Sequence, residues 1–326
     1  MTKIIITGGS GFIGTNIMIR LLELGYSNLL NIDLHPPIIE EHNNYYHKVD
    51  LKSIDELTEI FSKFKPSLVI HLAARTDLKG KNIEDYNDNT LALENLCKIL
   101  STNSFVERVI FTSTTLVCKA GYIPKSENDY CPTTAYGCSK VEGEKIINKY
   151  AAILPSFCLI RPTSIWGPYF KEPYKNFFDM VISEKFIRVG KKSCAKTYGY
   201  IGNSVNQILS LLFQKELNHN QKVYYIGDNP PYNIDDWSIQ IAALSGAKKP
   251  IKVPFFMLKC AAFLGDFLSK LGIKFPLTSF RLNNITTSNI MNCSSAIRNN
   301  KWNNIPLDAA ILETLSWLKA NRNKDE

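Results

Sequence analysis

Residues 3–14, Lys-Ile-Ile-Ile-Thr-Gly-Gly-Ser-Gly-Phe-Ile-Gly, decide the fold of this chain of 326 residues. An apolar run predicts a buried strand, and a helix is expected to come directly after it. Between them, Gly8 allows a tight turn, Gly11 lets a pyrophosphate approach the backbone, and Gly14 lets the helix pack against the strand. Free N–H groups and the positive dipole at the helix start attract an anion. The stretch therefore predicts a binding loop for a dinucleotide phosphate.

An acidic residue stands where such a loop needs one. Asp33 ends the second predicted strand, 19 residues after Gly14. A carboxylate at this place accepts hydrogen bonds from the ribose hydroxyls of NAD and repels the additional phosphate of NADP. No arginine follows Asp33 closely to compensate that phosphate. A solvated aspartate at a strand end is the alternative, and the spacing favours NAD binding.

The first half of the chain alternates short apolar runs with amphipathic stretches. Strands are expected at 3–7, 28–32, 67–73, 107–113 and 157–161, and helices at 12–25, 53–63, 83–102 and 136–151. This alternation is typical of an α/β fold with a Rossmann-type doubly wound parallel sheet.

The alternation ends after Pro168, where proline and glycine become frequent. We expect residues 1–165 to form an NAD-binding domain, to which a strand near 196–201 returns. Residues 166–326 are expected to form mainly a smaller, mixed α/β domain for the substrate. That domain would lie across the carboxyl edge of the sheet, where such folds bind ligands.

Composition excludes several other classes of protein. The net charge is +8, but the lysines and arginines are scattered, so a nucleic-acid partner is not expected. The eight cysteines include no C-x-x-C pair, and no metal site is predicted. No uncharged apolar run could span a bilayer, and the chain starts on a strand rather than a secretory signal. We therefore expect a cytoplasmic protein without a membrane partner.

A tyrosine and a lysine share one helix face later in the chain. Tyr136 and Lys140 are four residues apart, so their side chains point the same way. An ammonium beside a phenol favours the phenolate and would lower the tyrosine pKa toward the working range. The hydroxyl run 112–115 ends the preceding strand and supplies a further hydroxyl for the same substrate oxygen. Together these residues predict proton exchange with a sugar hydroxyl during hydride transfer.

These motifs resemble the extended short-chain dehydrogenase/reductase family, in particular its NAD-dependent nucleotide-sugar epimerase and dehydratase branch, which includes UDP-glucose 4-epimerase. The resemblance runs through nearly the whole chain and implies Tyr136, Lys140 and Thr114 as catalytic residues, with Ser113 as the second choice for the hydroxyl. It also implies a set of NAD contacts: Gly8, Gly11, Phe12, Ile13, Gly14, Asp33, Asp50, Leu51, Leu72, Ala73, Ala74, Asn89, Tyr136, Lys140 and Pro162. Substrate contacts are expected from Thr114, Ser164, Lys196 and Arg281.

Departures from the family pattern narrow the reaction. The 4,6-dehydratases have Asp-Glu directly after the catalytic threonine, where this chain has Thr115 and Leu116, so the elimination of water is not expected. The epimerase-reductases that make fucose have a cysteine at position 115, which Thr115 also argues against. Ser164 replaces an asparagine that commonly contacts the substrate, and Cys118-Lys119 replaces Tyr-Gly.

The sequence thus favours a nucleotide-sugar epimerase that acts at C4 through a transient 4-keto sugar. A 4-ketosugar reductase or sugar dehydrogenase with exchangeable cofactor is the main alternative, and a non-catalytic NAD(H)-sensing protein is a minor one. By analogy with the family, the helices at 83–102 and 136–151 would form a four-helix contact in a homodimer.

Overall fold

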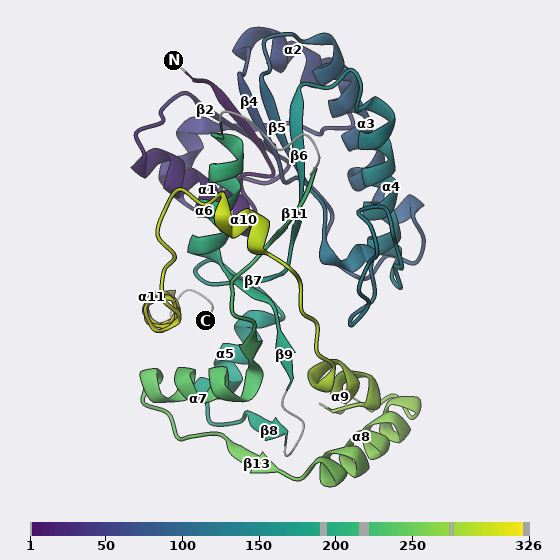
Figure 1. Ribbon diagram of the computed structural model, residues 1–326, viewed down its shortest axis with the longest axis vertical. Coiled ribbons are helices and arrows are strands. Elements are labelled where there is room, and N and C mark those ends of the chain that lie inside the picture. The colour runs from purple at the N-terminus through teal and green to yellow at the C-terminus, as the bar shows by residue number, and fades with distance from the viewer. Residues whose placement is uncertain (1, 190–193, 215–221, 274, 276, 322–326) are drawn as a thin grey trace.

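The computed structural model describes residues 2–189, 194–214, 222–273, 275 and 277–321. Seven parallel strands form its central sheet in the order β11-β6-β5-β4-β1-β2-β3 (Figure 1). Their bounds are β1 Ile4–Thr7, β2 Leu29–Asp33, β3 Tyr46–Lys48, β4 Leu68–His71, β5 Arg108–Thr112, β6 Ser156–Pro162 and β11 Val223–Ile226. The predicted Rossmann-type α/β fold is confirmed.

Helices cover both faces of this sheet because its strands are apolar on both sides. On β1, Ile4 and Ile6 face a core with α1 Phe12–Glu23 and α6 Ile201–Leu212. Ile5 points to the opposite face. The helices there are α2 Ile54–Phe64, α3 Asn87–Thr102 and α4 Ala135–Tyr150.

The second part of the chain carries three two-stranded sheets. They pair β7 Ser164–Trp166 with β10 Tyr198–Tyr200, β9 Ala195–Lys196 with β12 Tyr232–Asn233, and β8 Ile187–Val189 with β13 Ile251–Val253. Its helices are α5 Tyr174–Ile182, α7 Ile234–Ser245, α8 Phe255–Lys270, α9 Ser279–Thr286, α10 Ser294–Arg298 and α11 Leu307–Asn321. Short 3₁₀ helices complete the elements: η1 Glu40–Tyr45, η2 Glu84–Tyr86 and η3 Thr115–Val117.

The strand expected near 196–201 does not join the large sheet. It is divided into β9 and β10, and β10 pairs with β7 instead. The chain returns to the large sheet through α6 and β11, which pairs with β6 from within the half assigned to the substrate domain. Val223-Tyr224-Tyr225-Ile226 reads as an isolated strand in the sequence, and only its pairing with β6 reveals its place. The division at residue 165 itself stays a prediction.

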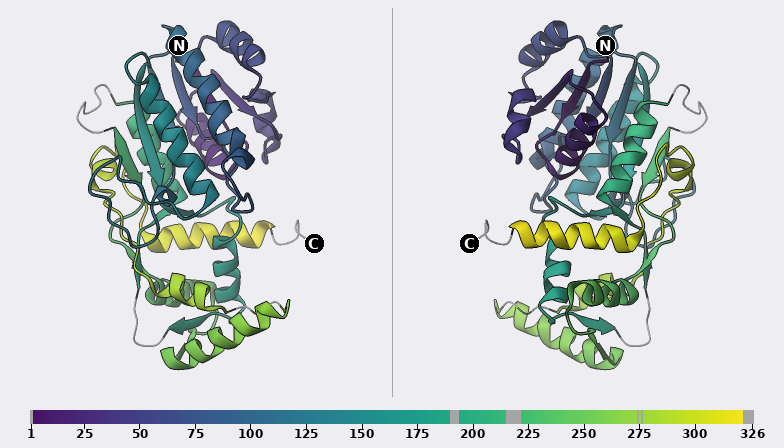
Figure 2. Two further views of the ribbon diagram at one scale, coloured as in Figure 1. Left: turned by 90° about the vertical axis from the view of Figure 1, so that its right-hand side faces the viewer. Right: turned by 90° about the vertical axis from the view of Figure 1, so that its left-hand side faces the viewer.

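The loops that leave the parallel strands converge on one edge of the sheet, as parallel strands require. Within the second part of the chain, α6 and β11 belong to the layers of the large sheet, whereas α5, α7 and α8 lie toward the lower end of the molecule (Figures 1 and 2). Over the described ranges, no helix has the length and apolar character needed to cross a membrane.

Candidate active site

The glycine loop after β1 has the geometry that its sequence predicts. Gly8 has a φ of +74°, and a Cβ there would lie 2.6 Å from the backbone nitrogen of Ala73. A Cβ on Gly14 would lie 2.3 Å from the carbonyl oxygen of Gly8. At Gly11 the nearest atom would be 3.3 Å away, so the loop stays open on that side. The backbone at Gly11 can therefore be approached by a phosphate, which fits a dinucleotide.

Asp33 lies at the carboxyl end of β2, beside this loop. Its Oδ2 accepts a hydrogen bond of 3.1 Å from the backbone N–H of Ser10, and its Oδ1 accepts one of 3.0 Å from His35. Buried Asn31, two residues earlier, donates to the Ser10 hydroxyl over 3.0 Å. These bonds orient the carboxylate toward the place where the ribose of NAD is expected.

One cavity of about 790 Å³ joins the loop, Asp33 and the tyrosine helix. This volume lies within the usual range for ligand sites. The predicted NAD contacts that line it are Gly8, Gly11, Phe12, Ile13, Gly14, Asp33, Asp50, Leu51, Leu72, Ala73, Ala74, Tyr136, Lys140 and Pro162. The predicted hydroxyls Ser113 and Thr114 line it as well. The residues present therefore fit NAD.

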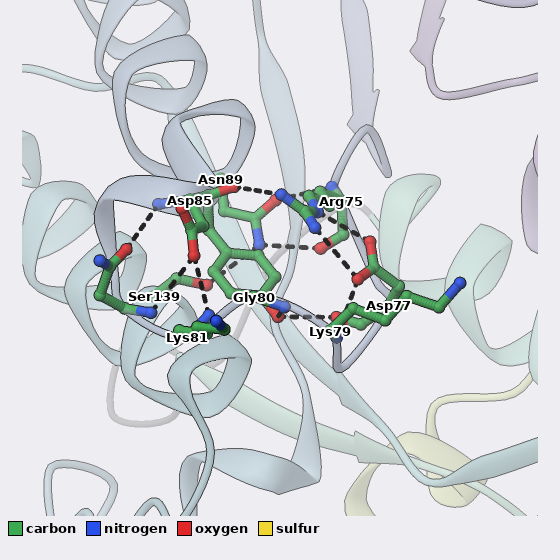
Figure 3. A network of polar contacts seen from close by, with 10 residues as sticks. Arg75, Asp77, Lys79, Gly80, Lys81, Asp85, Asn89 and Ser139 are labelled. Carbon is green, nitrogen blue, oxygen red and sulfur yellow. Dashed lines mark hydrogen bonds and ion pairs between the residues drawn. The ribbon is translucent and has the colours of Figure 1, made fainter.

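Asn89 is the one predicted NAD contact that does not line this cavity. Its Oδ1 accepts from the backbone N–H of Arg75 over 2.7 Å, and its Nδ2 donates to the Arg75 carbonyl and the Ser139 hydroxyl, both over 3.0 Å (Figure 3). Ser139 in turn donates to the carbonyl of Tyr136. Asn89 thus holds the loop after β4 against the first turn of α4, and its contact with NAD stays a prediction.

The segment after Arg75 is held by a further polar network, which Figure 3 shows around Asp77, Gly80 and Asp85. The Arg75 guanidinium pairs with Asp77 over 2.7 Å and lies 5.0 Å from the Tyr86 ring centroid. Tyr86 is buried and its ring lies 6.0 Å from that of Tyr136. The network therefore fixes one wall against which Tyr136 packs.

Tyr136 lies in the first turn of α4, where Thr134 caps the helix by accepting from Gly137 N–H over 3.0 Å. Burial raises the pKa of Tyr136 to about 12, while hydrogen bonding with Thr114 acts in the opposite direction. Lys140 therefore does not lower this pKa as the sequence predicted. The reason is geometric, because the Lys140 ammonium donates to the carbonyl of Thr112 over 2.9 Å.

Lys140 is buried in the same wall of the cavity. Burial lowers the pKa of its ammonium to about 8, and the Glu144 carboxylate partly opposes this shift. A lysine with a lowered pKa that lines the same cavity as a tyrosine and a hydroxyl is typical of a catalytic centre. Thr114 completes the group, since it precedes η3 and its Oγ1 accepts from Leu116 N–H over 3.2 Å.

Ser113 is engaged elsewhere. Its hydroxyl donates over 2.5 Å to Glu144, whose carboxylate forms a buried ion pair with Arg161 at 2.6 Å. Tyr130 donates to the same carboxylate over 2.9 Å. The Ser113 hydroxyl is therefore engaged by a buried carboxylate, although Ser113 lines the cavity together with Thr114. Arg161 is a charged residue within the apolar strand β6, and this is the feature of the sequence that indicates its ion pair with Glu144.

His71 is another buried group that sequence reasoning missed. It ends β4 opposite Thr7 on β1, and its Nδ1 shares a hydrogen bond of 2.7 Å with the Thr7 hydroxyl. Burial, followed by the charge of Lys140, lowers the pKa of His71 to about 3, so its imidazole is neutral. The pair stabilises the strand ends from which the glycine loop leaves.

Of the expected substrate contacts, Ser164 and Lys196 do not line the cavity. The Ser164 hydroxyl accepts from Tyr174, and Tyr174 rather than Ser164 lines the cavity. Lys196 is half-buried on β9 outside the cavity lining. Arg281 lies in α9, but its side chain is outside the described residues. Cys118 is buried directly after η3, and its thiol donates to the Asp129 carbonyl over 3.3 Å.

The model of the NAD dependent epimerase/dehydratase family matches residues 4–227, which span the glycine loop, the tyrosine helix and β11. The chain belongs to this family. NAD is accordingly its cofactor, and the family assignment agrees with the loop and carboxylate described above.

Individual relatives differ in their reactions. The N-acetyl-alpha-D-glucosaminyl-diphospho-ditrans,octacis-undecaprenol 4-epimerase of Escherichia coli O157:H7 is 25% identical over 86% of this chain and 84% of its own length. The 3-beta-hydroxysteroid dehydrogenase of Mycolicibacterium neoaurum is 25% identical over 84% of this chain and 79% of its own. The solved structure of UDP-glucose 4-epimerase from Thermotoga maritima, with UDP-glucose, superposes with a TM-score of 0.74 at 18% identity, covering 98% and 100% of the two chains. The names of these proteins thus differ in reaction and substrate, and the Thermotoga structure shares the fold.

Proposed function

We propose that this protein is an NAD-dependent 4-epimerase of a sugar carried on a diphosphate, with a nucleotide as the expected carrier. The observation that carries this proposal is the joint lining of one cavity by Asp33 at one end and Tyr136, Thr114 and Lys140 at the other. The 4-epimerase names of the Escherichia coli relative and of the Thermotoga structure support it. The former acts on a lipid-linked diphospho-sugar, so the carrier is part of the test.

Each residue at the reacting end of the cavity has a distinct role. Bound NAD supplies a hydride acceptor that can return the hydride to either face of the sugar. Tyr136 removes the proton from the C4 hydroxyl and gives it back at the end of the cycle. Thr114 orients the same oxygen through its hydroxyl. We assign to Lys140 the holding of the ribose and the stabilisation of the Tyr136 phenolate, for which its ammonium would leave the Thr112 carbonyl.

Elimination of water is disfavoured by the two residues after Thr114. Thr115 and Leu116 begin η3, and neither side chain carries an acid or base that titrates near neutral pH. The proposed centre can therefore transfer hydride and proton at C4 without removing a neighbouring hydroxyl. This distinguishes the proposal from the dehydratases in the same family.

A substrate deuterated at C4 provides the test. Purified protein is expected to contain bound NAD(H) and to convert an accepted sugar diphosphate without added cofactor. Mass spectrometry should find the deuterium retained at C4 of the product epimer, because the hydride returns to the carbon that released it. The panel includes UDP- and dTDP-linked hexoses and a polyprenyl-diphosphate-linked N-acetylhexosamine. Loss of the label, or stoichiometric consumption of added NADH, would instead identify a 4-ketosugar reductase or a dehydrogenase.

A further inference from the structure

Helix α8 is apolar on two faces. On its inner face, Leu258 and Ala262 are buried against Val189 and Leu282. The opposite face is exposed: Phe263 is 76% and Phe256 is 68% accessible to solvent. Six large apolar side chains recur there at helical spacing and form what we call the α8 surface: Phe256, Met257, Phe263, Leu264, Phe267 and Leu271. A helix that is apolar all round is normally buried on all sides, so this face is suited to a partner.

The α8 surface lies at an extremity of the molecule. In both views of Figure 2, α8 forms the lower end, away from the central sheet. The adjoining strands β8 and β13 carry two more exposed apolar side chains, Ile187 and its register partner Ile251. A surface at such an end can approach a large partner without interference from the catalytic half.

The charge of this region identifies the kind of partner. Residues 247–292 contain seven basic residues against the single Asp266, a net charge of +6 in a chain whose net charge is +8. The basic residues are Lys248, Lys249, Lys252, Lys259, Lys270, Lys274 and Arg281. Four of these lysines, at 248, 249, 252 and 259, have exposed side chains, and Lys248 pairs with Glu184 over 3.2 Å. Exposed aromatic and aliphatic side chains bordered by lysines match the interface of an anionic lipid bilayer.

We propose that the α8 surface docks on an anionic membrane, with α8 lying in the plane of the lipid headgroups. With 16 residues, α8 is about 24 Å long and is too short to cross the hydrocarbon core. A second copy of the chain fits less well, because a two-fold contact would bring the same lysines of both copies together. The proposal revises the expectation, drawn from sequence, that the protein has no membrane partner.

Vesicle flotation of the full chain tests the docking. We expect the wild-type protein to float with vesicles of equal parts phosphatidylcholine and phosphatidylglycerol, and at least about tenfold less with phosphatidylcholine alone. Phe256→Glu/Phe263→Glu should reduce binding to the mixed vesicles by at least about tenfold. Lys252→Gln/Lys259→Gln should weaken it by about 10- to 30-fold through charge alone. Ile153→Glu, at an equally exposed apolar position after α4, is the matched control and should float like wild type.

A fluorescent label reports which face enters the interface. Cys260 is the one cysteine with an exposed side chain, and it lies among the residues of the α8 surface. A polarity-sensitive nitrobenzoxadiazole label on Cys260 should shift its emission to the blue with mixed vesicles and should not shift in the Phe256→Glu/Phe263→Glu variant. Circular dichroism and thermal unfolding verify that this variant is folded.

Three results would overturn the docking. The first is wild-type protein that does not float with the mixed vesicles, and the second is a Phe256→Glu/Phe263→Glu variant that floats like wild type. The third is a wild-type protein that is dimeric, binds no vesicles and becomes monomeric in this variant. The last result would assign the surface to a second copy. Flotation needs neither sugar nor added NAD, so its failure would leave the proposed epimerase intact. Failure of the deuterium experiment would likewise leave the docking intact.

Discussion

At the scale of single residues, Tyr136 is the group on which the proposed chemistry depends most. Tyr136→Phe removes only the hydroxyl that exchanges the proton, and we expect turnover to fall by at least about 10²-fold. NAD content and thermal stability should change little, because the ring remains against Tyr86. Thr114→Val should have a smaller effect, since Thr114 orients the oxygen without carrying the proton. Near-wild-type rates in Tyr136→Phe would exclude the mechanism.

Asp33 decides between the two nicotinamide cofactors. Its carboxylate would face the 2′-phosphate of NADP. Repulsion between these two negative groups should weaken the binding of NADP by about 1–3 kcal/mol, or roughly ten- to hundredfold in affinity. Calorimetric titration of both cofactors into stripped protein measures the ratio. Asp33→Asn should reduce the ratio of NAD affinity to NADP affinity. Equal affinities in the wild-type protein would show that Asp33 does not contact the ribose.

At the scale of elements, the Arg161–Glu144 pair ties β6 to α4 and so positions the helix that carries Tyr136. Glu144→Gln leaves the Arg161 guanidinium buried with a weaker partner, and we expect the free energy of unfolding to fall by about 3–5 kcal/mol. Chemical denaturation measures this loss. The control is Glu142→Gln, two residues before Glu144, which breaks the exposed ion pair of Glu142 with Lys145. It should change the free energy of unfolding by less than about 0.5 kcal/mol. Equal effects of the two variants would contradict the role given to the buried pair.

The junction of β1 and β4 should make stability sensitive to acid. The pKa of His71 is about 3 in the folded protein against an ordinary value of 6.5, so the unfolded chain takes up the proton first. As pH falls below about 6.5, the free energy of unfolding should therefore decrease, by about 1.4 kcal/mol per pH unit from this group. Denaturation between pH 7 and pH 5 should show a shallower slope in His71→Asn, which keeps an acceptor for Thr7. Identical slopes in the wild-type protein and His71→Asn would mean that the pKa of His71 is not lowered by folding.

At the scale of the whole molecule, the two helices α3 and α4 lie side by side on one flank (Figure 1). We propose that this flank forms the homodimer expected from the family resemblance. Leu91 is a large apolar side chain exposed on α3, so Leu91→Asp should convert a dimer to a monomer in light scattering. Ile153→Asp is the control outside both helices. A wild-type protein that is monomeric at micromolar concentration would refute the dimer. Since α8 lies at the far end of the molecule, the dimer would leave the α8 surface free.

Much of the site is determined by the sequence over short distances. Gly8, Gly11 and Gly14 act through backbone space within one turn, and Tyr136 and Lys140 share a face because a helix repeats every four residues or so. Such local relations require only the correct secondary structure. The order of alternating strands and helices also leads to a parallel sheet, so the fold could be predicted. All but one of the expected NAD contacts line the cavity, and their contact with NAD stays a prediction.

Only the tertiary structure decided what depends on partners far along the chain. Asn89 turns its amide to Arg75 and Ser139 rather than to the cavity, and Ser113 gives its hydroxyl to Glu144. The seventh strand, β11, comes from the second half of the chain, and α8 keeps one apolar face exposed. In each case a side chain or strand has several possible partners of suitable chemistry. Which one it meets depends on packing between segments that the sequence separates by tens of residues.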